Sequence, residues 1–410
     1  MFDIENVRAD FPILDREIYG RKLIYLDNAA TTQKPSRVIA KIKEVYELYN
    51  SNIHRSISKL AATCTDEYEN ARKIVCGFIN AKSTHEIVFT SGTTAAINLL
   101  AFSFGEKFVN KGDEIVVCES EHHSNIVPWQ LMCERKNAVL KVLPFDDKGD
   151  LKTELLDELM TERTRLLCVA QATNVLGTVN PLDEIVRKAH EKGVYVLVDG
   201  AQGIQHVKTD VIASDFDFYV FSGHKIYAPT GTGILYGKEQ LLEQLPPWQG
   251  GGDMVKNVSF DKTTYSDLPL KFEAGTSNYV GAIGLGEALN YLTYMGIEKI
   301  HLYEKNLTDY ALEKISSIPE ITIYGKSANK IGVASFLAEG IHHADMGEIL
   351  DKMGIAVRTG RMCADPTVHH FGLTGLVRAS WTFYNTKPEI DSLCEGIEKA
   401  KKIFKTKSGA

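Results

Sequence analysis

Short apolar runs alternate with longer amphipathic stretches between residues 86 and 236. The runs predicted as strands are 87–90, 114–118, 139–143, 166–170, 195–199, 216–221 and 233–236. Helical patterns at 95–102, 152–162 and 183–192 lie between them. Runs that are apolar throughout indicate strands buried on both faces, and their alternation with helices is typical of βαβ units. The pattern predicts an α/β fold with a mostly parallel, mixed sheet flanked by helices.

The pattern differs before and after this region. A strand at 23–26 and helices at 37–49 and 65–78 precede it. A long helical pattern from 282 to 316, broken at Gly296, follows it. Then come predicted strands at 321–324, 333–337, 356–357 and 376–384, and helices at 344–353 and 387–404. Because 410 residues exceed one ordinary core, we expect a large domain at 21–295 and a smaller α+β domain formed by 1–20 and 296–410.

Composition and charge narrow the class of protein. The chain is 44% hydrophobic and 24% charged, as is typical of a folded globular protein. Its net charge of −7 and the lack of a basic stripe argue against nucleic-acid binding. No run reaches the roughly 18 apolar residues of a membrane span, and the acidic N-terminal segment differs from a signal peptide. We therefore expect a cytoplasmic protein that binds neither nucleic acid nor membranes.

The seven cysteines follow no metal-ligand or disulfide pattern, because their number is odd and no C-x-x-C pair occurs. Six fall in predicted helices or strands, where free cysteine usually packs as a small apolar residue. Cys363 differs, because it lies in a loop-like segment between Gly360 and Pro366, close to Arg358 and Arg361. Neighbouring guanidinium groups favour the thiolate, so we interpret Cys363 as a nucleophile.

Polar side chains follow the predicted strands of the large domain where each strand ends. They are Thr93, Thr94, His122, Asn174, Asp199, Gln202, Ser222, His224 and Lys225. The two threonines at a helix start can bind a phosphate, although a plain helix cap is the alternative. Asp199 closes an apolar strand, where a carboxylate needs a positive partner. Lys225 either extends its amine to solvent or, if buried, is a reactive amine.

One ligand would use all of these groups: pyridoxal 5′-phosphate (PLP). The residues that would hold its phosphate are Thr93, Thr94, Ser222 and His224. Asp199 would pair with the pyridine nitrogen, His122 would stack on the ring, and Lys225 would join the aldehyde. The residues that would reach the ring oxygen are Asn174 and Gln202. A dinucleotide site is the alternative, but the GTG at 231–233 lies between two strands and not before a helix.

Short motifs along nearly the whole chain match one family. They are YLDNAA (25–30), NIHR (52–55), GTT (92–94), EHHSNIVPW (121–129), NVLG (174–177), DGAQ (199–202), SGHK (222–225), FEAGT (272–276), RTG (358–360), CA (363–364) and VRAS (377–380). In these motifs the chain resembles fold-type I PLP-dependent enzymes of the class V aminotransferase group, and within it the SUF-type (group II) cysteine desulfurases. The resemblance implies that L-cysteine is converted to L-alanine and that Cys363 carries the sulfur as a persulfide for iron–sulfur cluster assembly.

The resemblance also implies roles for single residues and for partners. Arg378 would grip the substrate carboxylate, which suits a bidentate guanidinium. The other residues that would contact substrate are Asn174, His54, Ala29 and Arg358. His122 would handle protons near the leaving sulfur, and Lys225 would take the α-proton. Such enzymes are homodimers, in which Thr276 would reach the phosphate of the partner subunit, and the sulfur acceptor would be a SufE-like or SufU-like protein.

Other activities fit the same site, and the chain departs from the family pattern in places. The alternatives are a selenocysteine lyase, another class V aminotransferase-type enzyme and, least favoured, a non-catalytic sulfur-carrier scaffold. Arg361 and Met362 stand where the family commonly has two histidines before the cysteine. Ser91 and Ala95 replace an arginine and a glutamate, and the run at 171–173 lacks a histidine found in relatives.

Overall fold

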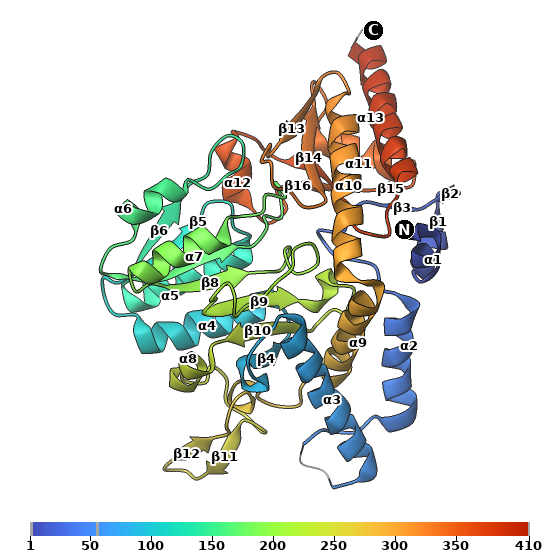
Figure 1. Cartoon of the computed structure of the whole chain (residues 1–410). Helices are drawn as coiled ribbons and strands as arrows, with labels where there is room; N and C mark the ends of the chain where they lie inside the picture. The colour runs from blue at the N-terminus through green and yellow to red at the C-terminus, as the bar shows by residue number, and fades with distance from the viewer. Residues whose placement is uncertain (1–2, 55–56, 409–410) are drawn as a thin grey trace.

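A seven-stranded sheet forms the centre of the molecule (Figure 1). The computed structural model describes residues 3–54 and 57–408. In spatial order the strands are β4 (Ile87–Thr90), β10 (Gly233–Gly237), β9 (Phe218–Ser222), β8 (Tyr195–Asp199), β7 (Thr164–Ala170), β5 (Glu114–Cys118) and β6 (Val139–Leu143). β10 runs antiparallel to β4 and β9, and the other neighbouring pairs are parallel. This mixed sheet confirms the predicted α/β fold class.

Apolar side chains cover both faces of the sheet, as the uninterrupted apolar runs predicted. Val196 and Val198 of β8 belong to the larger core cluster, and Leu197 between them belongs to the second cluster. Helices α3 (Lys59–Phe78), α7 (Leu182–Glu191) and α9 (Tyr279–Met295) contribute to the first cluster. Helices α4 (Thr93–Phe108) and α5 (Val127–Lys136) contribute to the second. Alternate side chains of a strand point to opposite faces, so both faces need an apolar cover.

A four-stranded antiparallel sheet occupies the C-terminal part of the chain, in orange and red in Figure 1. Its order is β13 (Ile321–Tyr324), β14 (Val333–Ala338), β17 (Leu376–Ser380) and β16 (Arg358–Gly360). Helices α10 (Ile297–Ser316), α11 (His343–Lys352) and α13 (Lys387–Ser408) share a separate apolar core with it. The strand predicted at 376–384 is too long, because the chain turns after Trp381 and Asn385 accepts a hydrogen bond from the Thr382 amide.

The N-terminal segment joins the two sheets. After α1 (Ile4–Ala9) and the short pair β1 (Glu17–Ile18) and β2 (Arg21–Lys22), strand β3 (Ile24–Tyr25) pairs in parallel with β15 (Ile355–Ala356). Asp27 then forms a bridge with Ser380 of β17. Gly296, with a φ of 86°, separates α9 from α10 as predicted, because glycine adopts positive φ without strain. The domain boundaries at 20/21 and 295/296 stay a prediction.

The remaining elements are peripheral. They are α2 (Ser36–Glu44), α6 (Leu156–Leu159), α8 (Glu239–Gln244), the β11 (Val255–Val258) and β12 (Thr263–Tyr265) hairpin, and α12 (Asp365–His370). The hairpin projects at the bottom of Figure 1. The helix predicted at 152–162 is helical only over 153–159, as a 3-10 turn followed by α6, because the buried Met160 adopts an extended backbone. Within 3–54 and 57–408, no helix is both long and apolar enough to cross a membrane.

Candidate active site

A cavity of about 240 Å³ lies where the central strands end and the C-terminal sheet approaches. The predicted site residues that line it are Ala29, Thr93, Thr94, His122, Asn174, Asp199, Gln202, Ser222, His224, Lys225, Arg358 and Arg378. The last two come from β16 and β17, and most of the others follow strands of the central sheet. His54, Thr276 and Cys363 do not line the cavity.

The start of α4 forms a cradle of hydroxyl groups. Thr93 Oγ1 lies 2.8 Å from Ser222 Oγ, and the Thr93 amide donates to the same oxygen at 2.8 Å. Thr94 Oγ1 lies 2.7 Å from the hydroxyl of Ser124, which the sequence did not predict although it belongs to the same motif as His122. These hydroxyls and the amides of the first helical turn suit a phosphate dianion.

Donors from the N-terminal loop hold the turn that carries Lys225. The His224 carbonyl accepts hydrogen bonds from the Thr32 amide at 3.1 Å and from the Thr32 hydroxyl at 3.1 Å. The Lys34 amine donates to the same carbonyl at 3.0 Å. The Thr32 hydroxyl also accepts a hydrogen bond from the Tyr227 amide at 2.8 Å. The backbone is therefore held on both sides of Lys225.

Neighbouring strands bring Asp199 and Lys225 to the same cavity. Asp199 ends β8, and Lys225 follows β9 in the turn Gly223–Lys225. Burial raises the pKa of Asp199, and the Ala201 amide and the Lys225 charge oppose that rise. Burial lowers the pKa of Lys225 to about 8, although Asp199 opposes this change. The amine is therefore available as a nucleophile and a base near neutral pH.

Two neutral imidazoles line the cavity. Burial, followed by the Lys225 charge, lowers the pKa of His122 to about 3 and that of His224 to about 4. The Ser124 amide donates to His122 Nδ1 at 3.1 Å. Nε2 of the neutral His122 ring therefore carries the hydrogen. An uncharged ring with one N–H group suits stacking on an aromatic ligand and bonding to one of its polar atoms.

In the described part of the chain, four buried polar atoms in the cavity wall lack a partner. They are Asn174 Oδ1, Gln202 Oε1, Arg378 Nε and Ser120 Oγ. The amide nitrogens of the first two side chains are satisfied, since Asn174 Nδ2 donates to the Met362 carbonyl and Gln202 Nε2 to the Ala29 carbonyl. Unpaired buried polar atoms are costly, so the cavity favours a polar ligand. Among the described residues, no group of three or more His, Cys, Asp or Glu could hold a metal ion.

Two guanidinium groups meet at the other end of the cavity. Arg358 and Arg378 lie opposite each other in the β16–β17 register. Arg378 is only 2% exposed, and it pairs with Asp27 Oδ1 at 2.9 Å and donates to the Asn174 carbonyl at 2.9 Å. Like charges directly across a strand pair repel each other. A ligand carboxylate would relieve the repulsion that Asp27 alone does not balance. Asp27 was not predicted, although it follows a predicted strand as Asp199 does.

Cys363 lies at the rim, one residue beyond Met362 of the cavity wall. All seven cysteines are free, and Cys363 alone is exposed. Arg361 pairs with Asp365 at 2.7 Å, so this guanidinium already has an acidic partner. The thiol is thus accessible both near the cavity and at the surface of the molecule.

Known proteins are similar to this chain in sequence. The sequence model of the family Aminotransferase class-V matches residues 24–393. The chain is 49% identical to a cysteine desulfurase of Escherichia coli K12 over 406 residues, which covers 98% of this chain and all of that one. The chain belongs to the class V aminotransferase family. The family match confirms the predicted family and its cofactor, PLP.

Two solved structures extend the comparison to the fold. The cysteine desulfurase CsdA from Escherichia coli, solved as an S-sulfonic acid, superposes with a TM-score of 0.92 at 39% identity and covers 98% of this chain and 99% of its own. The apo cysteine desulfurase of Thermococcus onnurineus NA1 also gives 0.92, at 35% identity, covering 97% of this chain and 98% of its own. Both confirm the fold-type I architecture.

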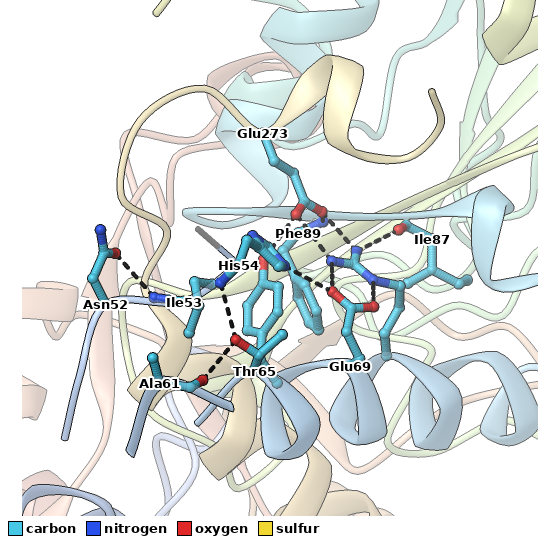
Figure 2. A network of polar contacts seen from close by, with 11 residues as sticks. Asn52, Ile53, His54, Ala61, Thr65, Glu69, Ile87, Phe89 and Glu273 are labelled. Carbon is cyan, nitrogen blue, oxygen red and sulfur yellow. Dashed lines mark hydrogen bonds and ion pairs between the residues drawn. The ribbon is translucent and has the colours of Figure 1, made fainter. Parts of the chain in front are cut away.

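His54 belongs to a buried polar network outside the cavity (Figure 2). Its Nε2 lies 3.2 Å from Glu69, whose carboxylate also pairs with Arg72 at 2.9 Å. Arg72 is fully buried and forms a second, bidentate pair with Glu273 at 2.7 and 3.0 Å. Glu273 in turn accepts the Phe89 amide of β4 at 2.7 Å. Within one chain, His54 therefore contacts this polar network and not the cavity. Its role in substrate binding stays a prediction.

Thr276 is exposed and lies three residues after Glu273 of that network. In a single chain Thr276 does not line the cavity. Arg55, in the motif with His54, lies outside the described residues. Thr276 stays a predicted phosphate ligand.

Proposed function

We propose that this chain is a PLP-dependent L-cysteine desulfurase that forms L-alanine and keeps the sulfur as a persulfide on Cys363. The observation that carries the proposal is an exposed thiol beside a cavity that fits PLP and also holds paired guanidiniums for a carboxylate. Relatives named cysteine desulfurases match along almost the whole chain. The cavity residues would bind the substrate and move its proton, and Cys363 would take its sulfur.

The cavity residues orient the amino acid and move its proton. PLP, when bound, withdraws electrons from the α-carbon of an amino acid. Asp199 would keep the ring nitrogen protonated, and Thr93 and Ser222 would hold the phosphate. Arg378 would bind the substrate carboxylate, and the Lys225 amine would accept the α-proton because its pKa is about 8.

Cys363 performs the sulfur chemistry. Its thiolate attacks the substrate sulfur, so that a new S–S bond forms and the bond between carbon and sulfur breaks. The electron pair of the broken bond stays with the carbon, which takes a proton and becomes the methyl group of alanine. The terminal sulfur then passes to a thiol of an acceptor protein of the SufE-like or SufU-like kind, for iron–sulfur cluster assembly.

The quaternary state and the compartment belong to the same proposal. A homodimer is supported by exposed apolar side chains in the N-terminal helical region and the hairpin, namely Tyr46, Leu48, Leu60 and Phe260. Light scattering of the purified chain tests it. A cytoplasmic location is supported by seven free cysteines, since reduced thiols are typical of that compartment.

Replacing Cys363 tests the function. Cys363→Ala should keep bound PLP and lose both persulfide and alanine formation from L-cysteine. Cys394→Ala is the matched control, because this half-buried helical cysteine should be dispensable. Undiminished sulfide and alanine production by Cys363→Ala would overturn the mechanism. Undiminished turnover of selenocysteine alone would instead identify a selenocysteine lyase.

A further inference from the structure

The backbone at Cys363 is strained. Met362 has a φ of 50° and Cys363 a φ of 55°, so two consecutive non-glycine residues occupy the left-handed region. This region is unfavourable for residues other than glycine, and such a residue persists only where neighbouring contacts hold it. Cys363 is exposed, so its own side chain contributes little packing. The Ala364 amide donates to the Arg361 carbonyl at 3.0 Å and closes a turn over these two residues, and further contacts come from other parts of the chain.

His123 supplies those contacts from the large sheet. It lies in the loop between β5 and α5, far from Cys363 in sequence. Its backbone amide donates to the Cys363 carbonyl at 2.8 Å. Its Nε2 accepts a hydrogen bond from the Asp365 amide at 3.1 Å and lies 2.9 Å from the Asp365 carboxylate. One residue thus binds the chain at Cys363 and again two positions later.

Other contacts from side chains act on positions next to Cys363. Asn174 holds the Met362 carbonyl, one residue before the thiol. The Arg361 guanidinium pairs with the Asp365 carboxylate and contacts no backbone group of Cys363 among the described hydrogen bonds. The Asp365 amide begins α12, where the first amides have no partner inside the helix. An imidazole nitrogen from a different part of the chain satisfies this one.

We propose that His123 is a positioning residue that keeps the thiol of Cys363 at the rim of the cavity for attack on the substrate sulfur. The inference rests on the proposed function. The imidazole does not touch the reacting atoms in this role. It fixes the backbone after the thiol, while Asn174 fixes the backbone before it. Contacts from two loops of the central sheet thereby support the turn that contains the two left-handed residues.

Three variants test the proposal. His123→Leu removes the acceptor for the Asp365 amide, His123→Gln keeps an acceptor at a similar reach, and His369→Leu changes an exposed histidine of the same segment as a control. The first readout is amide hydrogen exchange of residues 361–366 in the full chain, with and without PLP. We expect exchange to rise about tenfold in His123→Leu, because the local structure opens more often, and to be largely restored in His123→Gln.

The second readout is steady-state kinetics with L-cysteine. His123→Leu should lower kcat by about ten- to hundredfold with KM within about twofold of wild type, because a misplaced nucleophile slows sulfur transfer and not substrate binding. His123→Gln should recover most of kcat. His123→Leu could be unstable in thermal unfolding, and Asp365→Ala is then the second variant. It removes the carboxylate and keeps the contact between the Asp365 amide and His123. Amide exchange of residues 361–366 should therefore stay near wild type in Asp365→Ala.

Each outcome decides the question. Unchanged exchange and unchanged kcat in His123→Leu would overturn the positioning role. Restored exchange without restored kcat in His123→Gln would also overturn it, because it would indicate a role in proton transfer. Failure of the proposed function would be distinguishable from failure of the positioning role. In that case Cys363 of the wild-type protein would carry no persulfide, whatever the amide exchange shows.

Discussion

Lys225 and Cys363 are the two residues that we propose as nucleophiles, and their surroundings are opposite. The Lys225 turn follows a buried strand, and donors at Thr32 and Lys34 hold the carbonyl just before it. Cys363 is exposed on a left-handed backbone. The His123 amide bonds its carbonyl, and side chains of Asn174 and His123 bond the backbone on either side of it.

The difference matches the two tasks. A lysine that holds a cofactor needs an amine at a fixed position with a lowered pKa, and burial supplies both. A cysteine that collects sulfur in the cavity and delivers it to another protein must be reachable from both sides. Burial would block delivery, so contacts to the backbone replace packing as the means of placing the thiol.

The largest effect is expected for Lys225→Ala. Turnover of L-cysteine should fall by at least about 10³-fold, because no other lysine lines the described cavity. Borohydride reduction followed by mass spectrometry should find no PLP fixed to the variant. Lys225→Arg, which keeps the charge, should be equally inactive. Residual activity above a tenth of wild type in either variant would contradict the role of the amine.

Arg378→Lys tests the buried end of the cavity. KM for L-cysteine should rise roughly 10- to 100-fold with a smaller change in kcat, because an ammonium cannot replace a planar guanidinium that already bonds Asp27 and Asn174. Arg358→Lys, at a less buried position on the opposite strand, is the matched control and should change KM less. Equal effects of both substitutions would show that the two arginines are equivalent.

The pH dependence of aldehyde capture measures the Lys225 amine directly. Only the neutral amine reacts, and its pKa of about 8 lies below the usual 10.5. The rate of covalent PLP uptake by the cofactor-free chain should therefore fall about tenfold per pH unit below 8 and level off above it. Borohydride trapping with peptide mapping separates Lys225 from Lys34 and Lys330, whose pKa values burial also lowers to about 8. A rate that still climbs steeply between pH 9 and 10 would contradict the lowered pKa.

The smallest effect concerns the strained backbone of Cys363. Cys363→Gly should be more stable than Cys363→Ala by about 1 kcal/mol, because glycine adopts a φ of 55° without strain. The matched control is the exposed helical residue Lys73, where glycine should instead be less stable than alanine by about 1 kcal/mol. Urea unfolding of the four variants provides the comparison, and the same sign at both positions would contradict a strained Cys363.

The strand-end residues could be predicted because the carboxyl ends of parallel strands meet at one edge of the sheet. Apolar runs ending in Asp199 or in the turn of Lys225 place polar groups at one edge of a sheet, and both line the cavity as expected. The ends of the helix at 152–162 and of the strand at 376–384 could not be predicted, because a buried methionine and a side-chain hydrogen bond end these elements. Ser124, Asp27 and His123 escaped prediction because their partners are distant in sequence.

The sequence by itself determined the alternation of buried strands and helices, the polar residues at their ends and the family, because each depends on short patterns and motifs. The tertiary structure decided which loops of the C-terminal sheet close the cavity, that His54 and Thr276 lie outside it in one chain, and how Cys363 is held. The reason is physical. The strand pattern alone places the side chain at a strand end on the edge of the sheet. The position of an exposed thiol depends instead on hydrogen bonds from residues that only folding brings near.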